Sequence, residues 1–84
     1  MDLHRLRWAA RRGMLELDLV LLPFVENVYT ELDTQDQQRF HDLLECEDTE
    51  LFAWFLGKEE PEDDELKRIV KVILQNTGIR GEQL

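Results

Sequence analysis

The chain contains no serine and only one cysteine, Cys46. The first absence excludes a serine nucleophile, and a single cysteine cannot form an intramolecular disulfide, which fits a reducing compartment. Acidic residues flank Cys46 on both sides, and their negative charge opposes formation of the reactive thiolate. We therefore expect Cys46 to be a buried structural residue, and we expect the protein not to be an enzyme.

Long apolar runs are also missing. The stretch from Leu19 to Val25 is interrupted by Pro23 and is far shorter than the roughly 20 residues that cross a bilayer. The first 13 residues are too highly charged to form the apolar part of a signal peptide. We expect no membrane insertion and a cytoplasmic location in a bacterium.

Basic residues are scarce, since 10 Lys and Arg stand against 19 Asp and Glu, for a net charge of −9. Residues 1–13 hold four arginines against one aspartate, a balance of +3, which leaves −12 for the rest of the chain. An acidic body repels nucleic acid and anionic lipid, so no nucleic-acid partner is expected. The basic N-terminal segment is the one place where a negatively charged partner surface could dock.

What is present predicts an all-α fold. The chain has 84 residues, enough for one domain with a thin core and no deep cavity for an enclosed cofactor. Apolar residues recur at steps of three and four in segments at about residues 2–12, 15–32, 34–46, 48–57 and 62–78. We expect a small five-helix bundle, with a single domain over residues 1–78 and a flexible C-terminal tail at 79–84.

Two features of these helices can be tested directly. Pro23 lies inside the second segment and has no backbone N–H, so we expect a kink or a break there. The apolar stripe on both sides of it favours a kink. Thr34 and Gln37 have the spacing of a capping box at the start of the third segment, and Asp48 or Thr49 should cap the fourth.

The chain offers few ligands for a metal ion or a phosphate. Its glycines form no phosphate-binding loop, and the acidic run at residues 59–65 lacks the alternating ligands and central glycine of a calcium loop. His41 and Glu45 lie one helical turn apart, a spacing more typical of a surface contact than of a metal site. We expect no metal and no stably bound cofactor.

The most distinctive local pattern is a charged corner at Arg12, Gly13 and Glu16, between the first two predicted helices. Capping rules alone could explain it, because Gly13 is a preferred helix stop and Arg12 and Glu16 could form an exposed ion pair. The same three groups directed outward would also suit recognition of another protein, with Trp8 one turn earlier as an aromatic anchor. Spacing alone leaves both interpretations open.

The order of motifs along the whole chain adds information that this corner alone does not give. The run Arg-Arg-Gly-Met-Leu-Glu-Leu-Asp at 11–18 precedes Pro-Phe at 23–24, Leu-Leu-Glu-Cys-Glu-Asp at 43–48, Leu-Phe at 51–52, Trp54, Pro61, Leu66 and Ile-Val at 69–70. This order resembles the SdhE family of FAD assembly factors, whose mitochondrial members are succinate dehydrogenase assembly factors and whose hallmark is Arg-Gly-x-x-Glu. The resemblance covers about residues 8–73.

The resemblance implies a five-helix chaperone that promotes covalent attachment of FAD to the flavoprotein subunits of succinate dehydrogenase and fumarate reductase. The hallmark turn would contact the client near its flavin and favour the conformation in which a client histidine bonds to the flavin. FAD would then be attached to the client, and we expect this chain itself to be a monomer. The residues expected to bind the client are Arg12, Gly13 and Glu16, with Arg11 and Asp18 flanking them and Trp8 nearby.

A second hypothesis is an acidic regulatory or antitoxin-type protein that sequesters another protein. It would place the contacts on the acidic segments at 45–50 or 59–65 rather than on the turn at Gly13. Nucleic-acid binding by a helix-turn-helix of the first two segments is a third, which the net charge weakens.

Overall fold

The computed structural model describes residues 3–77, so the predicted tail at 79–84 and the predicted helix stop at Gly78 lie outside the described residues. Within that range the α-helices are α1 (Leu3–Ala10), α2 (Leu15–Asn27), α3 (Thr34–Leu44), α4 (Asp48–Phe55) and α5 (Asp64–Thr77), with one 3-10 turn, η1 (Tyr29–Glu31). Residues 3–77 contain no strand, and the prediction of an all-α fold with five helices is confirmed. None of these helices is long and apolar enough to span a bilayer.

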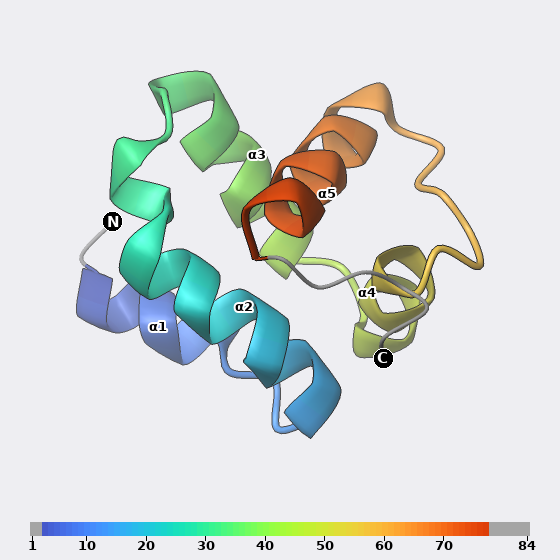
Figure 1. Ribbon diagram of the computed structural model, residues 1–84, viewed down its shortest axis with the longest axis horizontal. Helices are drawn as coiled ribbons and strands as arrows, with labels where there is room; N and C mark the ends of the chain where they lie inside the picture. The colour runs from blue at the N-terminus through green and yellow to red at the C-terminus, as the bar shows by residue number, and fades with distance from the viewer. Residues whose placement is uncertain (1–2, 78–84) are drawn as a thin grey trace.

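The helix α2 lies at the centre of the arrangement (Figure 1). It packs against α1 on one side and against α5 on another, while α3 pairs with α5 and α4 contacts both α2 and α5. The rings of Phe24 from α2 and Phe40 from α3 meet in the core with their centroids 5.2 Å apart. Each large apolar side chain buried in this way contributes about 1.5–3 kcal/mol. The largest fully buried side chains are Phe24, Phe40, Phe55, Leu6, Leu17, Leu21, Leu43, Leu51, Ile69 and Ile73.

The helix α2 continues through Pro23, so a break at this residue is excluded. Val20, Leu21, Phe24 and Val25 on either side of the proline are all buried. Their packing holds the helix together although Pro23 cannot donate its backbone hydrogen bond. The helix ends at Asn27, before the predicted residue 32, and the chain tightens into η1.

Both predicted N-caps are wrong. Asp33, not Thr34, caps α3, and its carboxylate accepts a 2.7 Å hydrogen bond from a backbone N–H three residues later. Glu47 caps α4 in a capping box with Glu50, so neither Asp48 nor Thr49 is the cap. An ionised carboxylate accepts backbone hydrogen bonds more strongly than a hydroxyl, which favours Asp33 over its threonine neighbour.

A buried carboxylate joins α3 to α5. Asp36 is 6% exposed, and it accepts hydrogen bonds from Arg39 at 2.8 Å and from Arg68 of α5 at 3.0 Å. Arg39 also pairs with Glu65 at the start of α5. The hydrogen bond from Arg68, together with that from Arg39, lowers the pKa of Asp36 below its usual value, against the opposing effect of burial.

Candidate functional site

The first two helices meet at a short connection, residues 11–14, that we call the Gly13 turn. Gly13 has a φ of +79°, in the left-handed region where only glycine is free of strain. A Cβ added at Gly13 would meet no atom within 4 Å, so the backbone conformation, and not crowding, requires glycine here. The turn therefore leaves a bare stretch of main chain at the surface.

The Arg12 side chain is directed inward and is only 16% exposed. Its Nε donates to Asp48 at 2.6 Å, and its two terminal nitrogens donate to the carbonyl oxygens of Leu44 and Cys46, each at 2.7 Å. These acceptors surround the connection between α3 and α4. The expectations that Arg12 is directed outward and that it pairs with Glu16 are therefore wrong.

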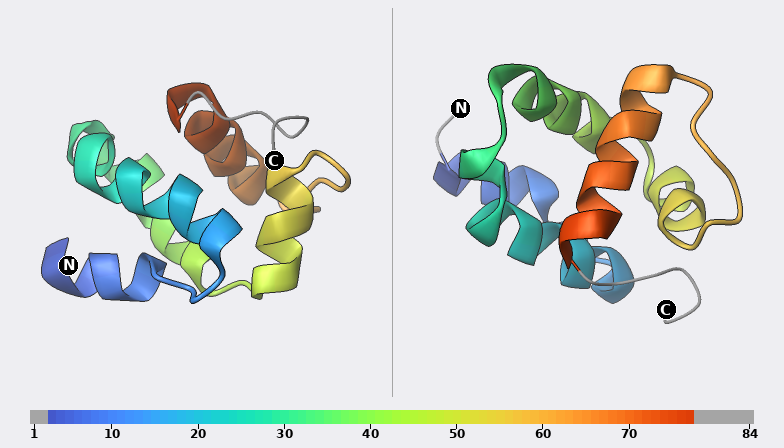
Figure 2. Two further views of the ribbon diagram at one scale, coloured as in Figure 1. Left: turned by 60° about the horizontal axis from the view of Figure 1, so that its bottom comes forward. Right: turned by 45° about the horizontal axis from the view of Figure 1, so that its top comes forward.

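These bonds bring together two connections that are far apart in the sequence. Figure 2 shows the Gly13 turn beside the link from α3 to α4. The bonds of Arg12 join it to residues 32 to 36 positions further along the chain. The backbone N–H of Arg12 also donates to the Asp18 carboxylate at 2.8 Å. The guanidinium and Asp18 thus hold the turn from both sides, and Asp18 is engaged within the chain.

Gly13 and Glu16 remain at the surface. The Glu16 side chain is exposed and has no hydrogen-bond or ion-pair partner within residues 3–77. It lies in the first turn of α2, where the helix dipole favours a carboxylate. Of the three hallmark residues, the Gly13 main chain and the Glu16 carboxylate are accessible to a partner. The Arg12 guanidinium holds the turn in place.

The other predicted residues lie on the α1 side of the turn. Arg11 is exposed, and its guanidinium has no carboxylate partner in the described part of the chain. The Trp8 side chain is 66% exposed. The structure therefore brings Trp8, Arg11, Gly13 and Glu16 to the surface around one turn.

Residues 4–77 match the protein family described as "Flavinator of succinate dehydrogenase". This chain belongs to that family. The chain is 58% identical over 73 residues to the FAD assembly factor SdhE of Pseudomonas aeruginosa, and the match covers 87% of each chain. It is 59% identical over 70 residues to the protein of the same name from Shewanella oneidensis, covering 83% of this chain and 85% of the relative. The Colwellia psychrerythraea protein of that name is 53% identical over 75 residues, and the match covers 89% of this chain and 82% of the relative.

The family match confirms the resemblance inferred from the order of motifs, and it includes the whole Gly13 turn. The assignment of client contacts to individual residues stays a prediction. Sequence reasoning missed the partner of Arg12 in this flavinator-family chain, because Asp48 lies 36 positions away and no spacing links the two. It also missed the hydrogen bonds by which Asp36 joins α3 to α5, here called the Asp36 clamp, since an acid in the first turn of a helix is more typical of a solvated position.

Reactive and ligand-binding groups are few in this member of the family. Cys46 is partly buried, and burial, followed by the negative charge of Glu50, raises the pKa of its thiol. The Nε2 atom of His41 lies 2.6 Å from the Tyr29 hydroxyl oxygen, within hydrogen-bond distance. Residues 3–77 hold no group of three His, Cys, Asp or Glu side chains that could bind a metal ion.

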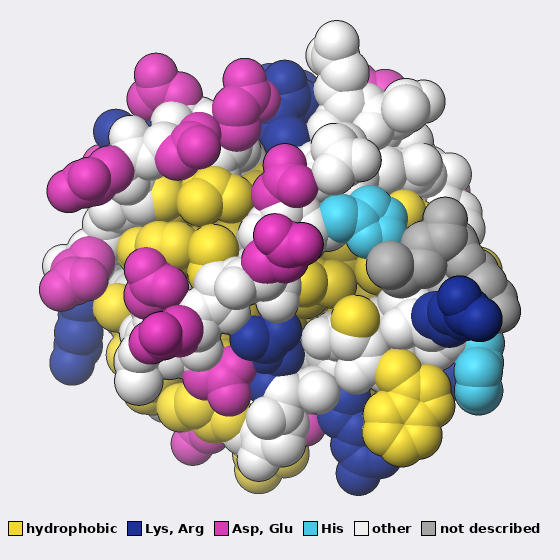
Figure 3. Space-filling view, turned by 180° about the vertical axis from the view of Figure 1, so that it is seen from behind, with side chains coloured by type: hydrophobic (Ala, Val, Ile, Leu, Met, Phe, Trp, Pro, Cys, Tyr) yellow, Lys and Arg dark blue, Asp and Glu magenta, His cyan; other side chains and the backbone are white. Residues whose placement is uncertain are grey.

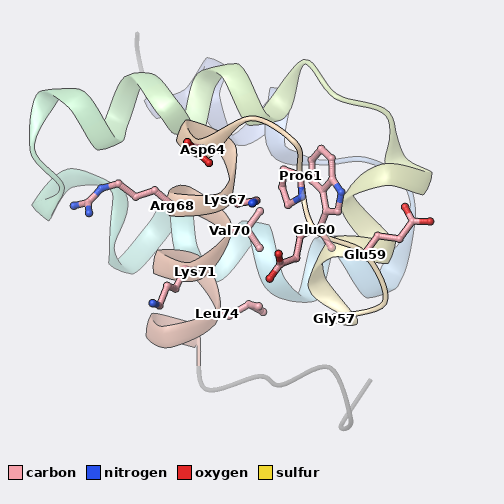
Figure 4. A pocket seen from close by; sticks show the side chains of 11 residues that line it. Gly57, Glu59, Glu60, Pro61, Asp64, Lys67, Arg68, Val70, Lys71 and Leu74 are labelled. Carbon is pink, nitrogen blue, oxygen red and sulfur yellow. The ribbon is translucent and has the colours of Figure 1, made fainter.

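A hollow lies away from the hallmark residues, between α4, the loop that follows it and α5 (Figure 4). It has a volume of about 690 Å³, and Pro61, Val70 and Leu74 form part of its apolar wall. Lys67 and Lys71 extend from α5 beside it, together with acidic side chains. None of the six predicted client-binding residues lines this hollow.

Proposed function

We propose that this chain is an assembly factor that binds the flavoprotein subunit of succinate dehydrogenase, and that of fumarate reductase, and promotes their covalent flavinylation. Its relatives in Pseudomonas aeruginosa and Shewanella oneidensis are named FAD assembly factor SdhE, which supports this role. So does the family to which the chain belongs, described as the flavinator of succinate dehydrogenase.

One observation carries the proposal at the level of residues. The Arg12 side chain is fixed by three hydrogen bonds to the α3–α4 link, while Gly13 and Glu16 beside it are exposed and Glu16 has no partner within residues 3–77. A main chain without a Cβ allows a partner to approach closely, and a carboxylate held on a rigid corner loses little entropy on binding. A preorganised corner of this kind suits docking onto another protein.

In this proposal the factor acts on the client's conformation. Binding can shift the client toward a flavinylation-competent state only by the difference between its affinities for the two client states. Gly13 and Glu16 would supply that difference, and Arg12 would keep them in position. The bond between a client histidine and FAD would form within the client, with this chain as a chaperone and not an enzyme.

The chain's own residues do not fit a stable FAD site at the turn. Helix N-termini bind phosphate when their N–H groups are open to an anion, but the first turn of α2 already holds two carboxylates, those of Glu16 and Asp18. Their carboxylates would repel the pyrophosphate of FAD. The cofactor is therefore proposed to stay with the client.

The alternative of an acidic sequestering protein has less support. Its contacts would use the acids at 45–50 and 59–65, but several of these are engaged within the chain. Glu47 and Glu50 form the α4 capping box, Asp48 binds Arg12, and Glu65 pairs with Arg39.

The test uses two glycines in matched conformations. Gly57 has a φ of +76°, and an added Cβ there also meets no atom within 4 Å, so Gly13→Arg and Gly57→Arg impose the same backbone strain. The flavoprotein subunit is produced in a bacterium that lacks its own assembly factor, together with each variant, and covalent flavin is read by in-gel fluorescence. Gly13→Arg is expected to lower the flavin signal about 10-fold, while Gly57→Arg leaves it near the wild-type level.

A second pair of variants separates the effect of the Glu16 carboxylate from the effect of net charge. Glu16→Ala is expected to lower the flavin signal, and Glu31→Ala, which removes another exposed carboxylate, is expected to leave it unchanged. Circular dichroism checks that each variant stays helical. Equal loss with both glycine variants, or a normal signal with both Gly13→Arg and Glu16→Ala, would overturn the proposal.

A further inference from the structure

An apolar groove runs between α1 and α2, next to the Gly13 turn. Its volume is about 640 Å³, and Trp8, Leu15 and Leu19 line its apolar part. These side chains are 66%, 68% and 54% exposed, although all three are large and hydrophobic. Scattered exposed leucines are ordinary, but several large apolar side chains around one groove mark a surface for a partner.

The polar part of the groove carries positive charge. Arg7 from α1 and Arg11 from the Gly13 turn line it together with Asp18 from α2. Asp18 already accepts the backbone N–H of Arg12, and Arg7 pairs with Glu26 at 2.8 Å. The guanidinium of Arg11 has no partner within residues 3–77, so the groove presents an uncompensated cation.

This charge is unusual on a protein with a net charge of −9. In Figure 3 acidic side chains gather over the upper left of the face, and some of the basic side chains lie at the lower right beside an exposed apolar ring. The residues that line the groove combine apolar side chains with arginines of the basic N-terminal segment. Such a surface complements a partner that brings apolar and acidic groups together.

We infer that the α1–α2 groove is the docking site for an acidic, apolar segment of the flavoprotein client. A large aliphatic or aromatic side chain of that segment packs against Trp8 and Leu19, and a flanking carboxylate pairs with Arg11. This inference rests on the proposed function, and it adds a second contact surface beside the hallmark residues. Arg11 and Leu15, which line the groove, flank the Gly13 turn on its two sides, so the groove lies next to the hallmark residues.

A second copy of this chain is a poorer occupant. A symmetric dimer through the groove would bring the two copies of Arg11 to the same interface, where like charges repel. A head-to-tail arrangement would leave open ends and would stack molecules that each carry −9. A client segment avoids both difficulties.

The first test measures binding of the purified apo flavoprotein subunit of succinate dehydrogenase, produced without this chain, by calorimetry. Trp8→Ala is expected to raise the Kd about 30-fold, as for an aromatic residue at the centre of an interface, and Leu19→Ala about 5-fold. Both side chains are more than half exposed, so unfolding by urea should remain close to wild type.

The second test isolates the charge. Arg11→Glu and Lys58→Glu each change the net charge by −2 at an exposed residue, but Lys58 does not line the groove. Arg11→Glu is expected to raise the Kd about 10-fold at low salt and by less at 0.5 M salt, because screening weakens the pairing. Lys58→Glu is expected to change the Kd by less than about 2-fold.

The outcomes separate the two proposals. If Gly13→Arg and Glu16→Ala abolish flavinylation but Trp8→Ala, Leu19→Ala and Arg11→Glu leave the Kd unchanged, the groove inference is wrong and the proposed function stands. If neither set has an effect, both fail. Sedimentation that shows a dimer of this chain, dissociated by Trp8→Ala without loss of client affinity, would assign the groove to a second copy and overturn the inference.

Discussion

Two neighbouring arginines have opposite environments in the Gly13 turn. The Arg12 guanidinium is bonded to Asp48 and to two carbonyl oxygens, and only 16% of its side chain is exposed. The Arg11 side chain is exposed and has no partner among the residues that the structure describes. The difference comes from their positions, since only Arg12 reaches the α3–α4 link, where its planar fork bonds a carboxylate and two carbonyl oxygens at once.

Arg12→Ala is expected to reduce the free energy of unfolding by about 2 kcal/mol, because it leaves Asp48 and the two carbonyl oxygens without their donor. Arg12→Lys keeps the charge but cannot reproduce the fork, and it is expected to cost about 1 kcal/mol. Urea unfolding followed by circular dichroism measures both values.

Arg11→Ala is the matched control for this prediction. It removes the same side chain one residue earlier, where no bond within residues 3–77 is lost, and it should change the free energy of unfolding by less than about 0.5 kcal/mol. Equal effects of Arg11→Ala and Arg12→Ala would contradict the role of Arg12 as the fixing residue.

At the scale of the helices, apolar spacing predicted most of the core. Leu17, Leu21 and Phe24 are buried as the stripe of α2 required, and Ile69 and Ile73 are buried in α5. Periodicity succeeds because the side chains of one helix face must share one environment.

The ends of the helices were harder to predict. Asp33 and Thr34 can both accept backbone hydrogen bonds, and the choice depends on where the chain leaves η1, which sequence spacing does not encode. The predicted helix through residue 32 ends at Asn27 for a similar reason, since tertiary packing of Tyr29 favours the tighter η1.

The hydrogen bonds of Asp36 with Arg39 and Arg68, which join α3 to α5, predict that the protein loses stability at low pH. The lowered pKa of Asp36 means that its stabilising effect is complete above the unfolded-state value near 3.8 and is lost as the pH falls through the folded-state pKa. Asp36→Asn is expected to lower the Tm by several degrees at pH 7. The difference in Tm between wild type and this variant should become smaller below about pH 4.

Thermal unfolding of both proteins between pH 7 and pH 2.5 measures that difference. Glu62→Gln serves as the control, because Glu62 is exposed, lies before α5 and has no hydrogen-bond or ion-pair partner within residues 3–77. A gap between wild type and Asp36→Asn that stays constant over this range would contradict the prediction.

For the whole molecule, the separation of charge could be predicted from the sequence because formal charges require no fold. The basic N-terminal region and the acidic remainder are both evident in the order of residues. The groove could not be predicted in this way, since the exposure of Leu15 and Leu19 depends on how α1 lies across α2. The inward direction of Arg12 likewise depends on a contact between loops that are distant in sequence.

The same charge distribution predicts that the isolated protein does not retain FAD. Its net charge of −9 repels the pyrophosphate, Glu16 and Asp18 lie at the start of α2, and Lys67 and Lys71 share their hollow with acidic side chains. In equilibrium dialysis FAD should distribute equally across the membrane when this protein alone is on one side. The apo flavoprotein subunit in the same apparatus is the positive control and should accumulate FAD. Saturable retention of FAD by this protein at micromolar concentrations would contradict the prediction and would give the chain a direct role in delivering the cofactor.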